Sequence, residues 1–178
     1  MKAVQLAEFK PTIFFLVKFI GLYLVANLLY GYYITSFEPK PDPVTRVVAE
    51  QTAFVLRIYG EEVVIFDSPR KPTTSLVNEG RGIIAVFEGC NGLNTIIIFM
   101  AFLFAFGPMS RNVLWFMPLG IVIIHLVNLL RVGMLFFVSK YMHEYLYFTH
   151  KYLFTAILYF VIFALWIIWV KYYSNKKV

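Results

Sequence analysis

Four apolar stretches dominate the chain, over about residues 12–35, 92–106, 112–138 and 152–172. A helix needs roughly 20 apolar residues to cross the hydrocarbon core of a bilayer, and only the second stretch is clearly shorter than that. The pattern predicts an all-α polytopic membrane protein with about four transmembrane helices. We expect these helices to form one membrane-embedded domain over residues 1–178.

One polar segment, residues 37–90, separates the first two apolar stretches. Within it, residues 44–59 have the pattern of an amphipathic helix. Residues 63–66 and 82–87 are typical of short strands, and turn-forming residues at 78–82 precede the second strand. The segment therefore predicts a small cap on the membrane surface, built from a helix and a two-stranded hairpin.

The composition supports lipid as the solvent for much of the chain. Hydrophobic residues make up 60% and charged residues only 15%, whereas a soluble domain carries charge on about a quarter of its residues. The net charge of +6 comes from basic residues near span ends and in one loop, without a basic-aromatic stripe. Membrane orientation is therefore a better interpretation than nucleic-acid binding.

The distribution of basic residues also predicts the orientation of the chain. The short segments at both ends and the turn after the second stretch are basic for their length, through Lys2, Lys10, Arg111, Lys171, Lys176 and Lys177. Cytoplasmic loops carry such an excess. We therefore expect a multi-pass protein of the cytoplasmic membrane, with both termini cytoplasmic and the 37–90 loop outside.

The single cysteine, Cys90, lies just before the second apolar stretch. One cysteine excludes an intrachain disulfide and a zinc site of the Cys-pair type, and we expect no metal or cofactor. A lone cysteine in an apolar protein is often only a small buried hydrophobe. However, a helix N-terminus can stabilise a thiolate, and flanking Gly89 and Gly92 allow close approach of a substrate backbone. We therefore interpret Cys90 as a candidate nucleophile.

Arg131 is the second candidate, because a charged residue within a membrane helix is costly unless it faces a polar partner or cavity. It could reach the outer interface by extending its side chain, but Asn128 and His125 lie one and two turns earlier on the same face. That polar stripe favours a position inside the bundle. A guanidinium could hold a carbonyl oxygen on which negative charge develops.

A thiol nucleophile also needs a proton acceptor, and the chain has three histidines. His150 opens the last apolar stretch, at a depth close to that of Cys90. His143 lies in the preceding loop, where a solvated role is the simpler interpretation, and His125 lies in mid-membrane. Depth favours His150, with His143 as the alternative.

Three further residues are candidates for substrate binding. Glu88 precedes Cys90 by two positions, so an extended backbone would place both side chains on one side, where Glu88 could bind a substrate amine or orient a histidine. Asn91 could supply a donor to a developing oxyanion, although capping of the following helix would also explain it. Asn128 belongs to the stripe that contains Arg131.

These residues resemble the motifs of the exosortase/archaeosortase family. Glu88-Gly89-Cys90-Asn91-Gly92-Leu93 resembles its Glu-(Ala/Gly)-Cys-(Ser/Asn)-Gly stretch, and Asn128-Leu129-Leu130-Arg131-Val132 resembles its Asn-x-x-Arg-Ile element. His150 matches the position of the third polar residue of that family. The short length and the Asn-Gly after the cysteine look most like the small F-type exosortases of Bacteroidota. Larger members have about eight spans and this chain is expected to have four, so the extra helices are either missing or supplied by partners.

The resemblance implies a membrane cysteine transpeptidase or protease. Cys90 would attack a peptide carbonyl near the C-terminal sorting signal of a secreted protein, Arg131 would steady the oxyanion, and His150 would protonate the departing amine. An envelope glycan or lipid could then accept the acyl group from the thioacyl intermediate. The alternative function is that of a non-enzymatic subunit of a transporter or channel, in which His125, Asn128 and Arg131 line a polar pathway.

Overall fold

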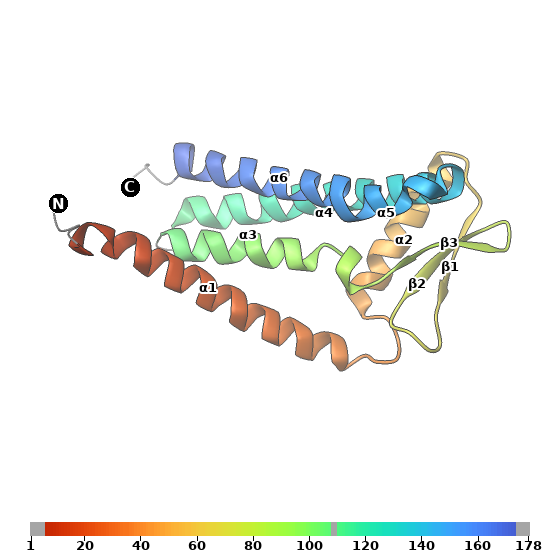
Figure 1. The fold of residues 1–178 in the computed structure, drawn as a ribbon, viewed down its shortest axis with the longest axis horizontal. Helices are drawn as coiled ribbons and strands as arrows, with labels where there is room; N and C mark the ends of the chain where they lie inside the picture. The colour runs from red at the N-terminus through yellow and green to blue at the C-terminus, as the bar shows by residue number, and fades with distance from the viewer. Residues whose placement is uncertain (1–5, 108–109, 174–178) are drawn as a thin grey trace.

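The computed structural model describes residues 6–107 and 110–173 of the chain. Long helices run side by side along the molecule, and a small sheet with one crossing helix closes one end (Figure 1). The long helices are α1 (Leu6–Thr35), α3 (Leu93–Phe106), α4 (Arg111–Tyr141) and α6 (Phe154–Ile168). A 3₁₀ turn (His143–Tyr145), the short α5 (Leu146–Phe148) and a π-helical turn (Thr149–Leu153) lead into α6, and a second π-helical turn (Trp169–Tyr173) follows it.

Three helical segments are long and apolar enough to cross a membrane: Phe9–Thr35, Arg111–Tyr141 and His143–Tyr172. The prediction of a mostly helical membrane protein with a small cap is therefore confirmed. α3 is apolar but has only 14 residues, so four spans stay a prediction. The last segment begins before the predicted residue 152, because the polar residues around His150 continue the helix instead of preceding it.

The two ends of the described chain lie at the end of the molecule opposite the sheet (Figure 1). The start of α1 and the end of the last helix are thus on one side, as the distribution of basic residues predicts. Several residues used in that prediction, Lys2, Lys176 and Lys177, lie outside the described residues, as do Pro108 and Met109 of the turn before α4.

The cap contains three antiparallel strands in the order β1-β2-β3: β1 (Val63–Asp67), β2 (Thr74–Asn78) and β3 (Arg81–Val86). The predicted two-stranded hairpin was therefore wrong, because the strand at 74–78 was missed. Its sequence has polar residues at inward positions, which hid the pattern. Thr74 donates to Asp67 at 2.8 Å, and the Asn78 amide donates to the Glu62 carbonyl at 2.9 Å, so both are buried with partners.

α2 (Pro43–Ile58) is the predicted amphipathic helix, and it joins the sheet to α4. Asp42 caps its N-terminus by accepting hydrogen bonds from the backbone N–H groups of Val44 and Thr45. Its buried face packs with the sheet and with α4 in one hydrophobic core, formed by Val48, Ala49, Ala53, Leu56, Val63, Leu76, Val86, Cys90, Val132 and Phe136. The candidate nucleophile is therefore anchored in the core of the cap.

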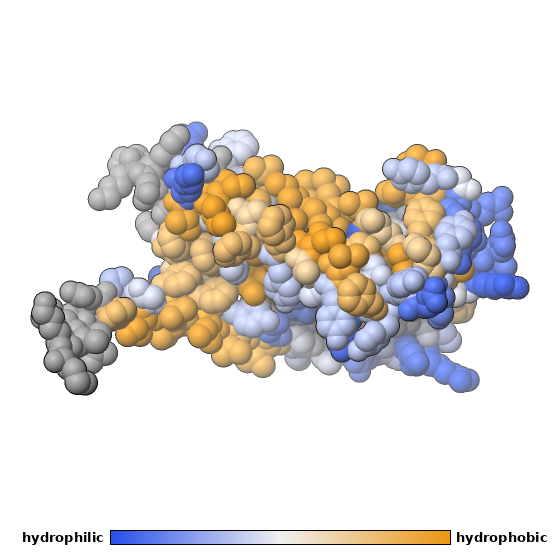
Figure 2. All heavy atoms as spheres, turned by 45° about the horizontal axis from the view of Figure 1, so that its top comes forward, coloured by the Kyte–Doolittle hydropathy of each residue, from blue (hydrophilic) through white to orange (hydrophobic). Residues whose placement is uncertain are grey.

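A second core holds the helices together below the cap. It is formed by Phe99, Leu103, Val113, Phe116, Ile124, Ile162, Leu165 and Trp169 from α3, α4 and the last helix. α1 contacts α3, and no residue of its apolar window is buried by the protein. Figure 2 shows hydrophobic side chains over the helices and hydrophilic ones gathered over the sheet. This arrangement is that of a membrane-embedded bundle with a polar cap.

Candidate active site

Cys90 lies in the connection between the sheet and the helix α3. β3 ends at Val86, a 3₁₀ turn follows over Glu88–Cys90, and α3 begins at Leu93. The turn is closed by a hydrogen bond of 2.7 Å from the Cys90 N–H to the Phe87 carbonyl. Only 4% of Cys90 is exposed. The thiol therefore sits just before a helix N-terminus, as the sequence predicts, but inside the protein.

His150 is the nearest candidate base to this thiol. Its Nε2 lies 3.4 Å from the Cys90 Sγ, within hydrogen-bonding distance for sulfur. The ring comes from the π-helical turn Thr149–Leu153, 60 positions further along the chain. Of the other two histidines, His143 is exposed but lines the same cavity as His150, so it stays the alternative. His125 lies elsewhere, with its Nε2 2.8 Å from the Gln51 side chain.

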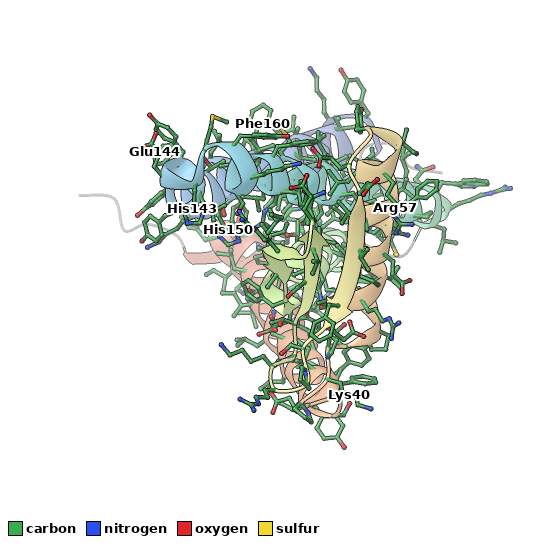
Figure 3. All side chains as sticks on the ribbon, turned by 90° about the vertical axis from the view of Figure 1, so that its right-hand side faces the viewer. Lys40, Arg57, His143, Glu144, His150 and Phe160 are labelled. Atoms are coloured by element: carbon green, nitrogen blue, oxygen red, sulfur yellow. The ribbon has the colours of Figure 1, made fainter. Side chains whose placement is uncertain are left out.

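The thiol and the imidazole open into a cavity of about 480 Å³. Its lining comes from β3, from α4 and from the turns that begin the last helix: Ile83, Ile84, Ala85, Val86, Cys90, Val132, Leu135, His143, Leu146, Tyr147 and His150. Figure 3, viewed from the sheet end, shows His143 and His150 close together beside the sheet, whereas Glu144 lies away from them. The cavity is mostly apolar and is lined by a few polar groups, among them the Cys90 thiol and the His150 imidazole, as ligand sites usually are.

Arg131 lies on α4 with 8% of its surface exposed. Its positive charge lowers the pKa of Cys90, so it acts on the thiol electrostatically. The ion pairs of the described residues do not include Arg131, and its Nε is buried without a hydrogen-bond partner there. It lines a second, much smaller cavity of about 40 Å³ against the last helix. A buried guanidinium with unused donors remains available to an anionic group.

Burial raises the pKa of the Cys90 thiol above its ordinary value. The Arg131 charge and a hydrogen bond from the Phe87 backbone act in the opposite direction, and the charge of Glu88 raises the pKa further. The expected thiolate stabilisation by the helix end is therefore outweighed by desolvation. A raised pKa favours the protonated thiol, so an attack by the sulfur would be assisted by a nearby proton acceptor such as the His150 imidazole.

Asn128 and Asn91 hold the turn that carries the thiol. The Asn128 amide donates to the Cys90 carbonyl at 2.9 Å, and the Asn91 side chain accepts from the Leu93 N–H at 2.9 Å. Both asparagines are almost fully buried. Their contacts are to the chain itself, which supports positioning roles, and the substrate-binding roles expected for them stay a prediction.

A network of side chains that the sequence analysis did not single out supports Asn91. Its amide donates to the Tyr30 hydroxyl at 2.9 Å and to the Thr45 hydroxyl at 3.1 Å. Tyr30 lies within 3.3 Å of the Glu88 carbonyl, and Thr45 donates to Asp42. Asp42 before Pro43 is an N-cap signal that the sequence carries. Nothing in the sequence pairs Tyr30 with the cysteine motif, because that contact depends on how α1 lies against the turn.

Glu88 is not aligned with Cys90 in the way the sequence analysis expected. That expectation assumed an extended backbone, in which residues two apart point to the same side, and it was wrong because residues 88–90 form a 3₁₀ turn. The Glu88 side chain is half-buried, and its carbonyl contacts Tyr30. A role in substrate binding stays a prediction.

Comparison with known proteins identifies the class. The family model for transmembrane exosortases matches residues 5–170, so the chain belongs to the transmembrane exosortase family. At the level of the family, this implies a cysteine transpeptidase that acts on secreted proteins with sorting signals. No curated protein and no solved structure matches the chain. The closer resemblance to the small F-type exosortases of Bacteroidota stays a prediction.

Proposed function

We propose that this protein is a membrane cysteine transpeptidase or protease that cleaves the C-terminal sorting signals of secreted proteins. One observation carries the proposal: the Cys90 sulfur and the His150 Nε2 lie 3.4 Å apart, and both residues line the same cavity. A nucleophile within hydrogen-bonding distance of its base is the arrangement that covalent catalysis requires.

In the proposed reaction, His150 accepts the thiol proton as the Cys90 sulfur attacks the scissile carbonyl carbon. The carbonyl π electrons move to the oxygen, and Arg131 stabilises the resulting oxyanion. The tetrahedral intermediate collapses with cleavage of the C–N bond, and His150 returns the proton to the departing amine. This leaves a thioacyl group on Cys90 and releases the sorting signal.

A second nucleophile then completes the cycle. A hydroxyl or amine of an envelope glycan or lipid, or water, loses a proton to His150 and attacks the thioester carbonyl. Collapse of this intermediate expels the Cys90 sulfur, which regains its proton. We place the site at the outer face of the cytoplasmic membrane, where secreted proteins and envelope acceptors meet.

The transporter alternative receives less support from the geometry. It required His125, Asn128 and Arg131 to line a common polar pathway, but His125 contacts Gln51 and Asn128 contacts the Cys90 carbonyl. The residues that line the cavity beside Cys90 and His150 include none of the three.

Comparison of protein C-termini in the native host tests the proposal. The gene is replaced by wild type, Cys90→Ala, His150→Gln, or His125→Gln, the last being a matched histidine variant outside the cavity. C-terminal peptides of the membrane fraction are then quantified by mass spectrometry, with enzyme abundance measured in parallel. We expect a set of secreted proteins to keep their C-terminal signals in the Cys90→Ala and His150→Gln strains only. Identical C-termini in all four strains would overturn the proposal.

A further inference from the structure

β3 is an edge strand, and the cavity lies along its free edge. It pairs with β2 on one side only, since the sheet order is β1-β2-β3. Residues from Ile83 to Val86 line the cavity, and the chain then runs directly into the turn that ends at Cys90. An unpaired edge presents backbone donors and acceptors that can bind another extended chain.

One contact identifies the edge that faces away from β2. The register pairs Gly82 with Val77 and Ile84 with Leu76, so Ile83 has no partner in β2, and its carbonyl instead accepts from Ser139 on α4 at 2.8 Å.

Ala85 lies two residues further along the strand, where it is exposed and opposite Ser75 in the register. Backbone polar groups in a strand alternate between its two edges, so we infer that the N–H and carbonyl of Ala85 share the edge used by the Ile83 carbonyl. Ala85 also lines the cavity.

We propose that the substrate binds as an extended strand added to the free edge of β3, with main-chain hydrogen bonds to Ala85, which delivers its scissile carbonyl to Cys90. This inference rests on the proposed function. Strand addition provides affinity through the backbone, while side chains of the peptide that point to one face enter the cavity and provide selectivity.

The walls of the cavity define the residue that fits. Val132, Leu135 and Leu146 surround the reactive pair, and the carboxylate-bearing side chains of the described residues are not part of the lining. We therefore assign an apolar substrate side chain to this cavity, next to the scissile bond.

A pair of peptide electrophiles tests strand addition. The probe is acetyl-Leu-Leu-Leu chloromethyl ketone, which alkylates a thiol with loss of chloride, and its partner carries N-methyl groups on the two internal amides. Rates of Cys90 alkylation in purified protein are measured by intact mass and divided by the rates with glutathione. We expect the methylated probe to react about tenfold more slowly, because one lost hydrogen bond costs up to about 1.5 kcal/mol.

An Ala85→Pro variant provides the second arm. Proline removes the N–H that would bond to the probe, so the unmethylated probe should slow to the rate of the methylated one. Equal normalised rates for the two probes on the wild-type protein would overturn strand addition, whatever the variant does. Failure of the proposed function gives a different result. In that case His150→Gln would alkylate at the wild-type rate with both probes, while the methylated probe would still react more slowly than the unmethylated one.

Discussion

At the residue scale, the proposed chemistry depends on the Cys90 thiol, whose pKa is affected in opposite directions by its burial and by its neighbours. Desolvation raises the pKa of Cys90, so the free thiol is a poor nucleophile at neutral pH. Arg131 partly opposes this effect with its charge, and His150 offers a nearby proton acceptor. In the proposed function, reactivity therefore depends on these three side chains together and not on the cysteine alone.

Replacement of Arg131 should change the pH dependence of Cys90 alkylation. Thiolate forms as the pH rises through the pKa, and Arg131 lowers that pKa, so Arg131→Gln should move the profile to higher pH. At a fixed pH below the pKa, the thiolate fraction, and with it the alkylation rate, falls about tenfold when the pKa rises by about 1. Iodoacetamide rates followed by intact mass across pH measure this effect.

Two reference proteins complete that experiment. Arg131→Lys keeps the charge and should keep most of the wild-type profile, whereas Lys71→Cys in a Cys90→Ala background supplies an exposed thiol. The wild-type profile should lie at higher pH than that of the exposed thiol. A move of the profile to lower pH in Arg131→Gln would contradict the electrostatic role.

Gly92 provides a test of the turn itself. It has a φ of 82°, and an added Cβ would lie 3.0 Å from the Asn128 Cγ. We expect Gly92→Ala to lose roughly 2 kcal/mol through the left-handed backbone and the contact with Asn128. Gly60→Ala, with a φ of 90° but open space around it, should lose only about 1 kcal/mol. Thermal unfolding followed by tryptophan fluorescence measures both, and equal losses would exclude the Asn128 contact.

The three principal residues could be predicted from the sequence because each carries its own physical signal. Cys90 precedes a helix, Arg131 is a charge within an apolar stretch, and His150 lies at the right depth. Their roles in catalysis stay a proposal. The pKa direction of Cys90 could not be predicted, since it depends on burial that only the packed turn reveals.

At the element scale, the site exists because three segments hold one short turn. Asn128 on α4 binds the Cys90 carbonyl, while Tyr30 on α1 and Thr45 on α2 bind Asn91. A buried donor that loses its partner costs about 1–3 kcal/mol, so this network fixes the turn strongly.

Loss of that network should loosen the turn and alter the thiol in a recognisable direction. In Asn91→Ala, Cys90 should become less buried, so its pKa should fall and its alkylation profile should move to lower pH, opposite to the change in Arg131→Gln. Peptide-probe labelling should nevertheless slow, because the thiol is no longer aligned. Asn94→Ala, which changes an exposed residue of the same motif, is the matched control. A profile that does not move in Asn91→Ala would contradict the positioning role.

Helices could be predicted from the sequence where one pattern of hydrophobic residues dominated a segment. α2 has a clear amphipathic pattern, and the long helices have long apolar runs. The strand at 74–78 was missed because Thr74 and Asn78 are buried polar residues, stabilised by partners that only the fold supplies. The 3₁₀ turn before α3 was missed because contacts that hold it, such as that of the Asn128 amide with the Cys90 carbonyl, come from other parts of the fold.

At the scale of the whole molecule, the fold separates a polar cap from an apolar bundle. The cap carries the thiol and the cavity, and the ends of the described chain lie at the far end of the bundle (Figures 1 and 2). The basic residues predict that both ends share a side, and the cytoplasmic location of that side stays a prediction.

Labelling from one side of the membrane tests this orientation. Lys71→Cys lies in the cap and Arg111→Cys at the start of α4, both exposed and both placed in a Cys90→Ala background. A membrane-impermeant maleimide applied to intact cells should label the first and spare the second until the cells are lysed. The reverse pattern would place the site in the cytoplasm.

The most direct test of the account is the covalent state of Cys90 during turnover. The protein is isolated from its native host by rapid acid quenching, and the peptide that contains Cys90 is analysed by mass spectrometry with and without hydroxylamine, which cleaves thioesters. We predict a hydroxylamine-sensitive acyl group whose sequence comes from a secreted protein cut before its sorting signal, and which is absent from Cys90→Ala. An unmodified Cys90 in cells that process those proteins normally through this enzyme would contradict the account.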